Sequence, residues 1–452
     1  MTAPQRVLTR KTIASYAIGS LGTGGFATLP GLVLVFYLTD TLGIAALAAG
    51  IVVTVAKVWD VIIDPVIGAR SDRSLARRGS RRPLMMVGAL ALPVFFILTF
   101  AVPGGLGPVV SGGWVLLAFL ITATAFSLFQ VPYIALPAEL ASDYDERTRL
   151  ISARVVVLTV AILLFGAGAP AIRDAFADER TGYLVMAIVA GLVIGAGMFV
   201  SSFVARRGAV GVAEKVSIAD NYRAGFDALR RSQPFRALLA TFLLQGLATG
   251  LMLAGAQYVA AWVLGTGVTI LFISLIAPAI LFAPLWAVIS RRVGKERAFV
   301  IASLLFGAAA LVMLLQVWIP GPWIYAPVAL AGAGYAGMQS LPMSMLPDVI
   351  SHDARRSGAG SAGTFGGMWT AGETTGMALG ATVLTIVLAA SGYIESVAGE
   401  HVTQPGSAIA GIVLSFSIVP AVIIAASLWT FSRYPLRKAD IDELVATAAG
   451  AE

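Results

Sequence analysis

Cysteine is absent from the sequence, and histidine occurs only twice, at His352 and His401. The first absence excludes disulfides and thiolate-bound metals, and two distant histidines do not make a metal cluster, so we expect no bound metal or organic cofactor. Charged residues are also scarce, at 12% of the 452 residues against about 25% in soluble proteins. Because 58% of the chain is hydrophobic, the sequence predicts an all-α membrane protein.

Apolar stretches long enough to cross a bilayer predict about twelve transmembrane helices in two sets of six. The expected spans are 12–39, 43–69, 83–103, 113–137, 150–171, 182–205, 237–264, 267–290, 298–319, 322–347, 358–390 and 407–431. The predicted organisation is an N-terminal half (1–205), a central linker (206–236), a C-terminal half (237–431) and a tail (432–452). Two basic loops are similar, R-R-G-S-R-R-P after the second helix of the first half and R-R-V-G-K-E-R-A after the second helix of the second half. Their matching position favours a duplicated transporter architecture.

Basic residues are distributed unevenly between the two sides of these spans. Of the 31 Lys and Arg residues, 27 fall in alternate connections, which the positive-inside rule places in the cytoplasm together with both termini. This topology accounts for the net charge of +7, so we expect no nucleic-acid partner; we expect a multi-pass monomer in a bacterial cytoplasmic membrane, with its first helix retained. In the linker, Ile218, Tyr222, Phe226 and Leu229 recur at helical spacing, which indicates an amphipathic surface helix or, alternatively, a solvated linker.

Three charged residues, Lys57, Asp60 and Asp64, interrupt the second apolar span. Their spacing of three and four residues puts them on one helical face, and we expect the helix to end at Arg70, before a basic loop. A charge near the bilayer midplane costs at least about 2.5 to 3.5 kcal/mol, so such residues usually have a function. Their net charge of minus one suits a transported cation or proton; the alternative is an ion pair that only holds helices together.

Several motifs resemble those of the glycoside/pentoside/hexuronide:cation symporters, the melibiose permease-like family of the major facilitator superfamily. The most specific is W-D-V-I-I-D-P at 59–65. Supporting matches are Ser15, Tyr16 and Gly19, V-P-Y-I-A-L at 131–136, D-Y-D-E-R-T at 143–148, Arg154, and L-P-D-V-I-S-H-D at 346–353. The resemblance implies cation-coupled symport of a sugar, glycoside, uronide or related solute by alternating access, with Asp60 and Asp64 as cation ligands and no enzymatic activity.

The loop after the second span also resembles the cytoplasmic signature of the superfamily, which implies a role in gating. The matching residues are Gly68, Asp72, Arg73, Gly79, Arg81 and Arg82. We expect Arg147, beside Asp143, to form ion pairs between this loop and the next cytoplasmic loop in one transport state and to release them in the other. The alternative is that these charges are only solvated.

Two departures from the family bear on the coupling ion and the substrate. The family's lysine in helix eleven is missing, and Thr374 stands at or near its place with Glu373 beside it. An isolated carboxyl group in an apolar helix is a candidate proton carrier, so the coupling ion is expected to be Na⁺ or H⁺; the alternative for Glu373 is a hydrogen bond between helices.

The family's acidic sugar ligands are replaced by Gly24 and Gln130. The remaining candidates for substrate contact, which are polar or aromatic, are Tyr16, Trp59, Gln130, Tyr133, Arg154, Tyr258, Trp262 and Trp369. Each aromatic has packing as its alternative role. A glycine-rich first helix also suits an amphipathic lipid, and a relative of this family transports lysophospholipids. A membrane enzyme acting on lipid phosphates and a non-transporting sensor are the rivals from other classes.

Overall fold

The computed structural model describes residues 8–141, 144–205, 227, 229–357, 362–400 and 402–436. The regular elements of this part of the chain are helices, with one isolated antiparallel bridge between Leu42 and Val397 and no strands. Eleven of its helical segments are long and apolar enough to cross a membrane. A twelfth long helix, α13 (Tyr325–Ser357), is not among these eleven; it is 33 residues long and contains several Gly, Tyr and Pro residues. The all-α membrane fold predicted from the sequence is therefore confirmed.

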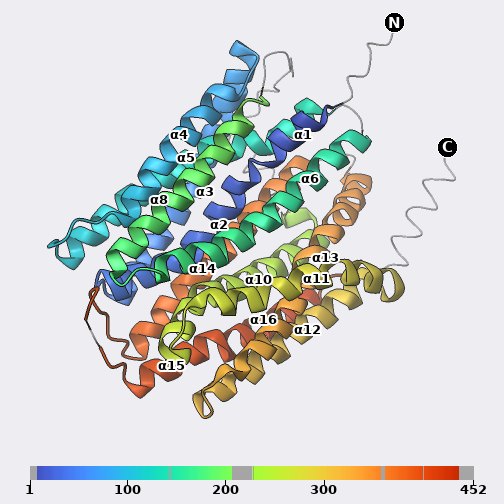
Figure 1. Ribbon diagram of the computed structural model, residues 1–452. Coiled ribbons are helices and arrows are strands. Elements are labelled where there is room, and N and C mark those ends of the chain that lie inside the picture. The colour runs from blue at the N-terminus through green and yellow to red at the C-terminus, as the bar shows by residue number, and fades with distance from the viewer. Residues whose placement is uncertain are drawn as a thin grey trace, which may run out of the picture. The chain divides into compact units, whose positions relative to one another are not determined.

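The chain forms two compact units (Figure 1), residues 1–218 with 395–402 and residues 219–394 with 403–452. In unit 1, α4 packs against α5 and α8, α3 packs against α5, and α2 packs against α6. The helices of unit 1 are α1 (Arg10–Ala17), α2 (Ser20–Phe36), the π-helix η1 (Tyr37–Thr41), α3 (Ala46–Arg78), α4 (Arg82–Phe100), α5 (Pro108–Leu140), α6 (Tyr144–Leu163), the π-helix η2 (Leu164–Gly168), α7 (Ala169–Asp174) and α8 (Glu179–Ser202).

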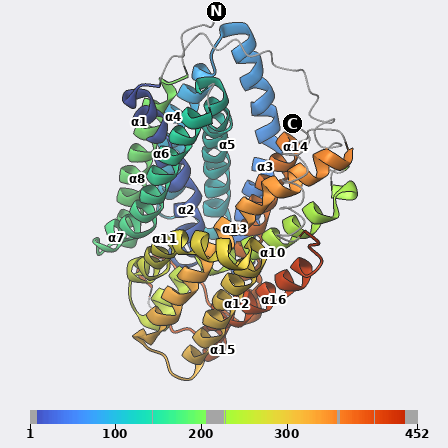
Figure 2. The ribbon, with the colours of Figure 1, turned by 90° about the vertical axis from the view of Figure 1, so that its right-hand side faces the viewer.

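In unit 2, α10 packs against α14 and α16, and α13 packs against α11 and α12 (Figure 2). Its helices are α10 (Gln233–Tyr258), the π-helix η3 (Val259–Leu264), α11 (Val268–Val293), α12 (Lys295–Met313), the 3-10 helices η4 (Leu314–Val317) and η5 (Pro322–Ile324), α13, α14 (Ala362–Ala390), α15 (Gly406–Phe416) and α16 (Ile418–Phe431). The middle of each predicted span lies within one of these helices. The predicted linker helix falls largely on 206–226 and 228, outside the described residues.

The predicted end of the second helix at Arg70 is wrong. The helix α3 continues to Arg78, because Ser71 and Leu75 are buried on its inner face and give the charged segment a packed side. It ends at Gly79, whose φ of +65° is the left-handed conformation that commonly closes a helix and that glycine adopts without strain. Asp72 and Arg73 therefore lie on a helix, and the connection to α4 is only three residues long.

Candidate functional site

The helix α3 presents Lys57, Asp60 and Asp64, and Asp60 lies near the middle of its 33 residues. The Lys57 Nζ is 3.3 Å from the Asp60 Oδ2, with side chains 32% and 13% exposed, respectively. The Oδ1 atoms of Asp60 and Asp64 are both buried and accept no hydrogen bond from the residues that the structure describes. Lys57 therefore satisfies one oxygen of this pair of carboxylates and leaves others available.

Ser127 of α5 adds a hydroxyl to this group, because its side chain is a polar neighbour of the Asp64 carboxylate. The two helices pack along their length, and a second polar contact joins them where the Trp59 Nε1 donates to the Thr124 Oγ1 at 2.8 Å. Two carboxylates one turn apart, with a hydroxyl from the facing helix, are hard oxygen ligands of the kind that Na⁺ binds. The predicted Asp60, Asp64 and Lys57 thus lie together, and Ser127 joins them.

A second polar cluster in unit 1 joins α1 and α2 to α5 and α6. The rings of Tyr16 and Tyr133 stack with centroids 4.7 Å apart, and the Tyr133 hydroxyl contacts the Ser20 Oγ at 3.0 Å. The Arg154 guanidinium lies 5.3 Å from the centre of the Tyr133 ring, and its buried Nε has no hydrogen-bond partner among the described residues. Arg154 is thus a cation with free donor capacity beside aromatic faces.

The two positions that replace the family's acidic residues behave differently. Gln130 of α5 faces α2, because the Thr23 Oγ1 donates to the Gln130 Oε1 at 2.7 Å. Gly24 is a contact between helices, since a Cβ at this position would lie 2.7 Å from the Ala161 Cβ and 3.1 Å from the Leu158 carbonyl. A larger side chain at Gly24 would therefore have to separate α2 from α6.

In unit 2, Glu373 lies on α14, and the Gln339 side chain of α13 is a polar neighbour of its carboxyl group. The Gln339 Nε2 also donates to the Tyr335 hydroxyl at 3.0 Å. Thr374, the next residue on α14, is half-buried. Glu373 therefore has a neutral polar neighbour on another helix, and both roles that its sequence indicates stay open.

The aromatic candidates of unit 2 lie in two places. Trp369 is 2% exposed and stacks on Phe242 with centroids 4.1 Å apart, although its buried Nε1 has no hydrogen-bond partner in the described part of the chain. Tyr258 and Trp262 both make edge-on contacts with Tyr393, at 5.5 and 6.3 Å. Packing accounts for most of the surface of Trp369, whereas Trp262 retains partial exposure.

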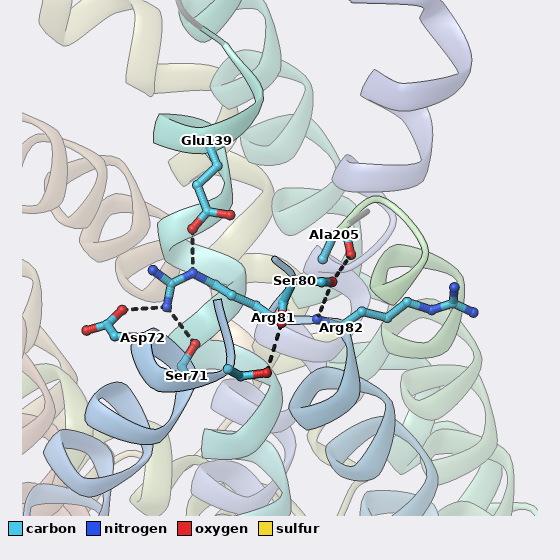
Figure 3. A network of polar contacts seen from close by, with 8 residues as sticks. Ser71, Asp72, Ser80, Arg81, Arg82, Glu139 and Ala205 are labelled. Atoms are coloured by element: carbon cyan, nitrogen blue, oxygen red, sulfur yellow. Dashed lines mark hydrogen bonds and ion pairs between the residues drawn. The ribbon is translucent and has the colours of Figure 1, made fainter. Parts of the chain in front are cut away.

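The signature residues form a polar network centred on Arg81 (Figure 3). The guanidinium donates to the Glu139 Oε1 of α5, to the Ser71 Oγ at 2.6 Å, and to the Asp72 Oδ1 at 2.7 Å. Burial alone lowers the pKa of Arg81, but hydrogen bonds and ion pairs with Glu139 and Asp72 outweigh it and raise that pKa. Ser80 extends the network by donating to the carbonyl of Ala205, after α8. This network therefore joins the ends of α3, α5 and α8.

The other predicted gating residues make contacts outside the network around Arg81. Arg147 donates to the Ala141 carbonyl at 3.2 Å, Arg82 stacks over Phe203 at 4.2 Å, and Arg73 is exposed. Gly68 faces α5, where a Cβ would lie 3.7 Å from Val131. Asp143 lies outside the described residues.

Three residues that the sequence did not single out complete these groups, namely Ser127, Glu139 and Gln339. For Ser127 a signal existed, because Thr124, Ser127 and Gln130 recur every three residues on one face of α5. Glu139 and Gln339 gave no such signal, since their importance depends on partners from other helices.

Comparison with known proteins places this chain among transporters. A family model described as MFS/sugar transport protein matches residues 15–438. An uncharacterized symporter of Synechocystis is 26% identical, over 95% of this chain and 94% of its own length. A glucuronide carrier protein homolog of Escherichia coli is 24% identical, over 97% and 95%. A sodium-dependent lysophosphatidylcholine symporter of Danio rerio is 25% identical, over 96% and 87%.

A solved structure, that of a D-xylose-proton symporter, superimposes with a TM-score of 0.69, covering 94% of this chain and 98% of that one at 12% identity. This likeness shows the major facilitator fold. The family model covers most of the chain, from the first helix to the last. The chain therefore belongs to the MFS/sugar transport proteins, the glycoside/pentoside/hexuronide:cation symporter family that its motifs resemble.

Proposed function

We propose that this protein is a secondary active transporter that couples the movement of a cation to symport of a sugar, glycoside, uronide or related organic solute by alternating access. It is a multi-pass membrane protein, and the distribution of Lys and Arg favours a bacterial cytoplasmic membrane with both termini in the cytoplasm. Membership of a transporter family argues for transport over catalysis.

The cation site is formed by Asp60 and Asp64. The observation that carries this assignment is the pair of buried Oδ1 atoms that have no hydrogen-bond partner among the described residues. A buried carboxylate oxygen without a partner is costly, and a bound cation would offset that cost. Ser127 would add an oxygen ligand, and Lys57 keeps the net charge of the group at minus one.

The coupling ion is Na⁺ or H⁺. The oxygen ligands on α3 suit Na⁺, whereas a carboxyl group such as Glu373, on a helix with no other charged residue, suits a proton. Thr374 offers a hydroxyl beside Glu373 at the place of the family's lysine. We therefore assign proton transfer, where it occurs, to Glu373.

The solute is recognised by the polar cluster around Arg154 in unit 1. The free Nε of Arg154 suits a carboxylate such as that of a uronide, Gln130 suits a hydroxyl, and the exposed ring of Trp59 suits the face of a sugar. The rings of Tyr16 and Tyr133 are buried and stack on each other, so packing accounts for them. In unit 2, the partly exposed Trp262 is the candidate for a further contact with the solute, whereas Tyr258 and Trp369 are buried and packed.

A second candidate substrate is an amphipathic lipid such as a lysophospholipid. The observation that favours it is a cavity in unit 2 whose wall is mainly apolar, formed by residues such as Met252, Phe272, Ile276 and Met377. Such a wall offers few partners to sugar hydroxyls and suits an acyl chain. The relative in Danio rerio is named as a lysophosphatidylcholine symporter.

The test is uptake by purified protein in phosphatidylcholine vesicles with an imposed Na⁺ gradient, an imposed proton gradient, or neither. Radiolabelled methyl glucuronide, methyl xyloside and lysophosphatidylcholine are compared as solutes. We expect gradient-driven accumulation of one solute class, and we expect Asp60→Asn and Asp64→Asn to abolish it. Arg154→Gln should reduce uptake of the glucuronide much more than that of the neutral xyloside.

Glu400→Gln serves as the control, because Glu400 is an exposed carboxylate that bonds its own loop at the Val397 amide. Accumulation that persists in the Asp60→Asn, Asp64→Asn double variant would overturn the cation site. If uptake tracked the Na⁺ gradient and ignored pH alike in the parent and in Glu373→Gln, the proton role would be excluded.

A further inference from the structure

Part of the connection between α14 and α15 belongs to the other half of the molecule. Residues 395–402 are part of unit 1, whereas the chain up to Ile394 and from Thr403 onward is part of unit 2. The distribution of Lys and Arg assigns this connection, and the one between η1 and α3, to the side of the membrane opposite the cytoplasm. Residues 42–45 and 391–405 contain neither Lys nor Arg, as this assignment requires.

Residues 395–398 run along the end of η1 and bond its carbonyl groups. The Ser396 amide donates to the Thr39 carbonyl at 3.0 Å, and the Ala398 amide donates to the Thr41 carbonyl at 3.1 Å. The Ser396 hydroxyl donates to the Asp40 carbonyl at 3.2 Å. The last carbonyls of a helix have no partner within that helix, and η1 ends at Thr41. This segment therefore supplies the donors that the end of η1 needs.

The same segment also reaches the start of α3. The Glu395 Oε1 accepts a hydrogen bond from the Ala46 amide at 2.7 Å, and Val397 forms the isolated antiparallel bridge with Leu42. Gly43, with a φ of +64°, lets the two segments approach, because a Cβ there would lie 2.9 Å from the Val397 Cγ2. Residues 395–398, which we call the strap, are thus fixed to both ends of the turn between η1 and α3.

The strap begins directly after a second anchor, which lies in unit 2. The Gln404 Nε2 donates to the Ile394 carbonyl at 2.6 Å, and the Ile394 amide donates to the Gln404 Oε1 at 3.0 Å. The preceding residue, Tyr393, makes edge-on contacts with Tyr258 and Trp262. The strap starts at the next residue, so the chain has no unattached residue between the anchor in unit 2 and the bonds to unit 1.

Two adjacent anchors leave no slack for movement. Consecutive Cα atoms are about 3.8 Å apart, so the two anchors cannot separate by more than a few Å while both hold. Alternating access, in contrast, moves the two halves of a transporter apart on each side of the membrane in turn. One of the two anchors must therefore give way when the side opposite the cytoplasm opens.

The strap is the weaker of the two anchors. Tyr393 and Gln404 are only 5% and 8% exposed, and the Gln404 amide bonds Ile394 through both its nitrogen and its oxygen. In the strap, Glu395 and Ala398 are half-buried, and each bonds unit 1 through a single hydrogen bond at these contacts. Water competes better for half-buried partners, so the strap should detach first.

We propose that the strap restrains opening of the transporter on the side opposite the cytoplasm, and that it detaches from η1 and α3 each time this side opens. The inference rests on the alternating access of the proposed function. It adds the element that controls opening on one side of the membrane.

The first test needs no transported solute. Ser396→Ala removes the hydroxyl bond to Asp40, and it should speed amide exchange at Ala398 by roughly 2- to 10-fold, because the strap opens as one unit. The Tyr393 amide is the control, since it donates to the Leu388 carbonyl at 3.0 Å within unit 2, and its exchange should not change. Both amides are measured on the full chain in phosphatidylcholine vesicles, and circular dichroism checks that the variant keeps its helices.

The second test locks the strap. The chain has no cysteine, so the Leu42→Cys, Val397→Cys double variant carries one pair of thiols that can bond only to each other within the chain. Residues opposite each other in an antiparallel bridge have Cα atoms about 4.5 to 5.5 Å apart, which a disulfide can span. Loss of free thiols, counted by mass spectrometry, reports the bond.

Uptake is then measured with whichever of radiolabelled methyl glucuronide, methyl xyloside and lysophosphatidylcholine the parent accumulates. We expect oxidation to abolish accumulation in the double variant and dithiothreitol to restore it. Each single cysteine variant is a control, and oxidation should leave its uptake unchanged.

A matched variant separates restraint by the strap from local damage to unit 1. Eight-residue Gly-Ser insertions after Ile394 and after Val402 each add up to roughly 25 Å of slack on one side of the strap. With both insertions present, the oxidised double variant should accumulate solute again. Continued loss of uptake would mean that the disulfide disables unit 1 itself, and it would overturn the proposal.

Three other results are decisive. An Ala398 amide that exchanges equally fast in the parent and in Ser396→Ala would show that the strap does not open as one unit. Accumulation that persists with the disulfide formed would show that the strap need not detach. If the parent accumulates none of the three solutes, the proposed transport fails instead, and the exchange at Ala398 and Tyr393 still decides whether the strap exists.

Discussion

Loss of the Arg81–Glu139 contact should loosen the end of α3 more than loss of the Arg81–Asp72 contact. Both acids pair with the same guanidinium, but the Glu139 side chain is 16% exposed and the Asp72 side chain 51%. Water competes for the half-exposed partner and much less for the buried one. Replacing each acid with leucine removes its acceptor oxygens and tests this difference.

The magnitudes follow from these environments. A hydrogen bond to a charged group contributes about 1.5 to 3 kcal/mol, and an exposed ion pair contributes about 0.2 to 1 kcal/mol. Since about 1.4 kcal/mol corresponds to a tenfold change in an equilibrium, Glu139→Leu should raise local opening roughly 10- to 150-fold, and Asp72→Leu no more than roughly fivefold. The raised pKa of Arg81 keeps the guanidinium charged, so the effect should not vary with pH near neutrality.

Hydrogen–deuterium exchange of the amides in 74–85 measures this opening directly, because these residues span the end of α3 and the start of α4. Arg73→Leu is the control, as Arg73 is exposed on the same helix. The reasoning is refuted if Asp72→Leu accelerates exchange as much as Glu139→Leu does.

Three further outcomes can be measured on the purified protein. Gly332→Ala should lower the free energy of unfolding by about 1 to 3 kcal/mol, because its Cβ would lie 2.0 Å from the Leu275 carbonyl oxygen. Gly366→Ala is the control, since a Cβ there would have no atom within 4 Å, and it should leave stability unchanged or improve it. Thermal unfolding followed by tryptophan fluorescence compares the two variants. Glu395→Ala should speed amide exchange at the start of α3 by roughly fivefold, because the Glu395 Oε1 accepts a hydrogen bond from the Ala46 amide at 2.7 Å and a lost cap costs about 1 kcal/mol. Equal exchange in the parent and the variant would show that this contact does not hold the helix end. Asp178 caps α8, and hydrogen bonds from Thr181 lower the pKa of its carboxyl group. The stability that this cap contributes is therefore present above the ordinary aspartate pKa and is lost as the pH falls below about 4. Asp178→Asn should remove this pH dependence from amide exchange at the start of α8.

The sequence alone locates the charged group on α3 because charge is rare in apolar spans, so Lys57, Asp60 and Asp64 are evident without any tertiary information. It misses the true end of this helix, because S-D-R-S-L-A-R-R has the composition of a loop and the burial of Ser71 and Leu75 appears only in the packed unit. Glu139 is missed for a similar reason, since it lies 58 residues from Arg81 and nothing local connects them. Trp369 shows the converse, in that an aromatic side chain suited to stack on a sugar stacks on Phe242 instead.

Unit 2 carries a counterpart of the Arg81 network, which allows the same argument to be tested twice. The segments L-P-D at 346–348 of α13 and L-P-A-E at 136–139 of α5 share Leu-Pro shortly before an acidic residue. The Lys295 Nζ, at the start of α12, is 2.5 Å from the Asp348 Oδ2. This ion pair is held by fewer hydrogen bonds than the Arg81 network, because lysine is a single point charge whose other bond is to the Ser344 carbonyl. Its side chain is also 37% exposed.

We therefore expect Asp348→Leu to raise amide exchange at the start of α12 by less than Glu139→Leu raises it at the start of α4, by roughly fivefold or less. An equal or larger effect in unit 2 would mean that burial of the cation does not determine the strength of these contacts. Replacing Lys295 with arginine should then add a second donor to Asp348 and slow the exchange, as bidentate pairing predicts.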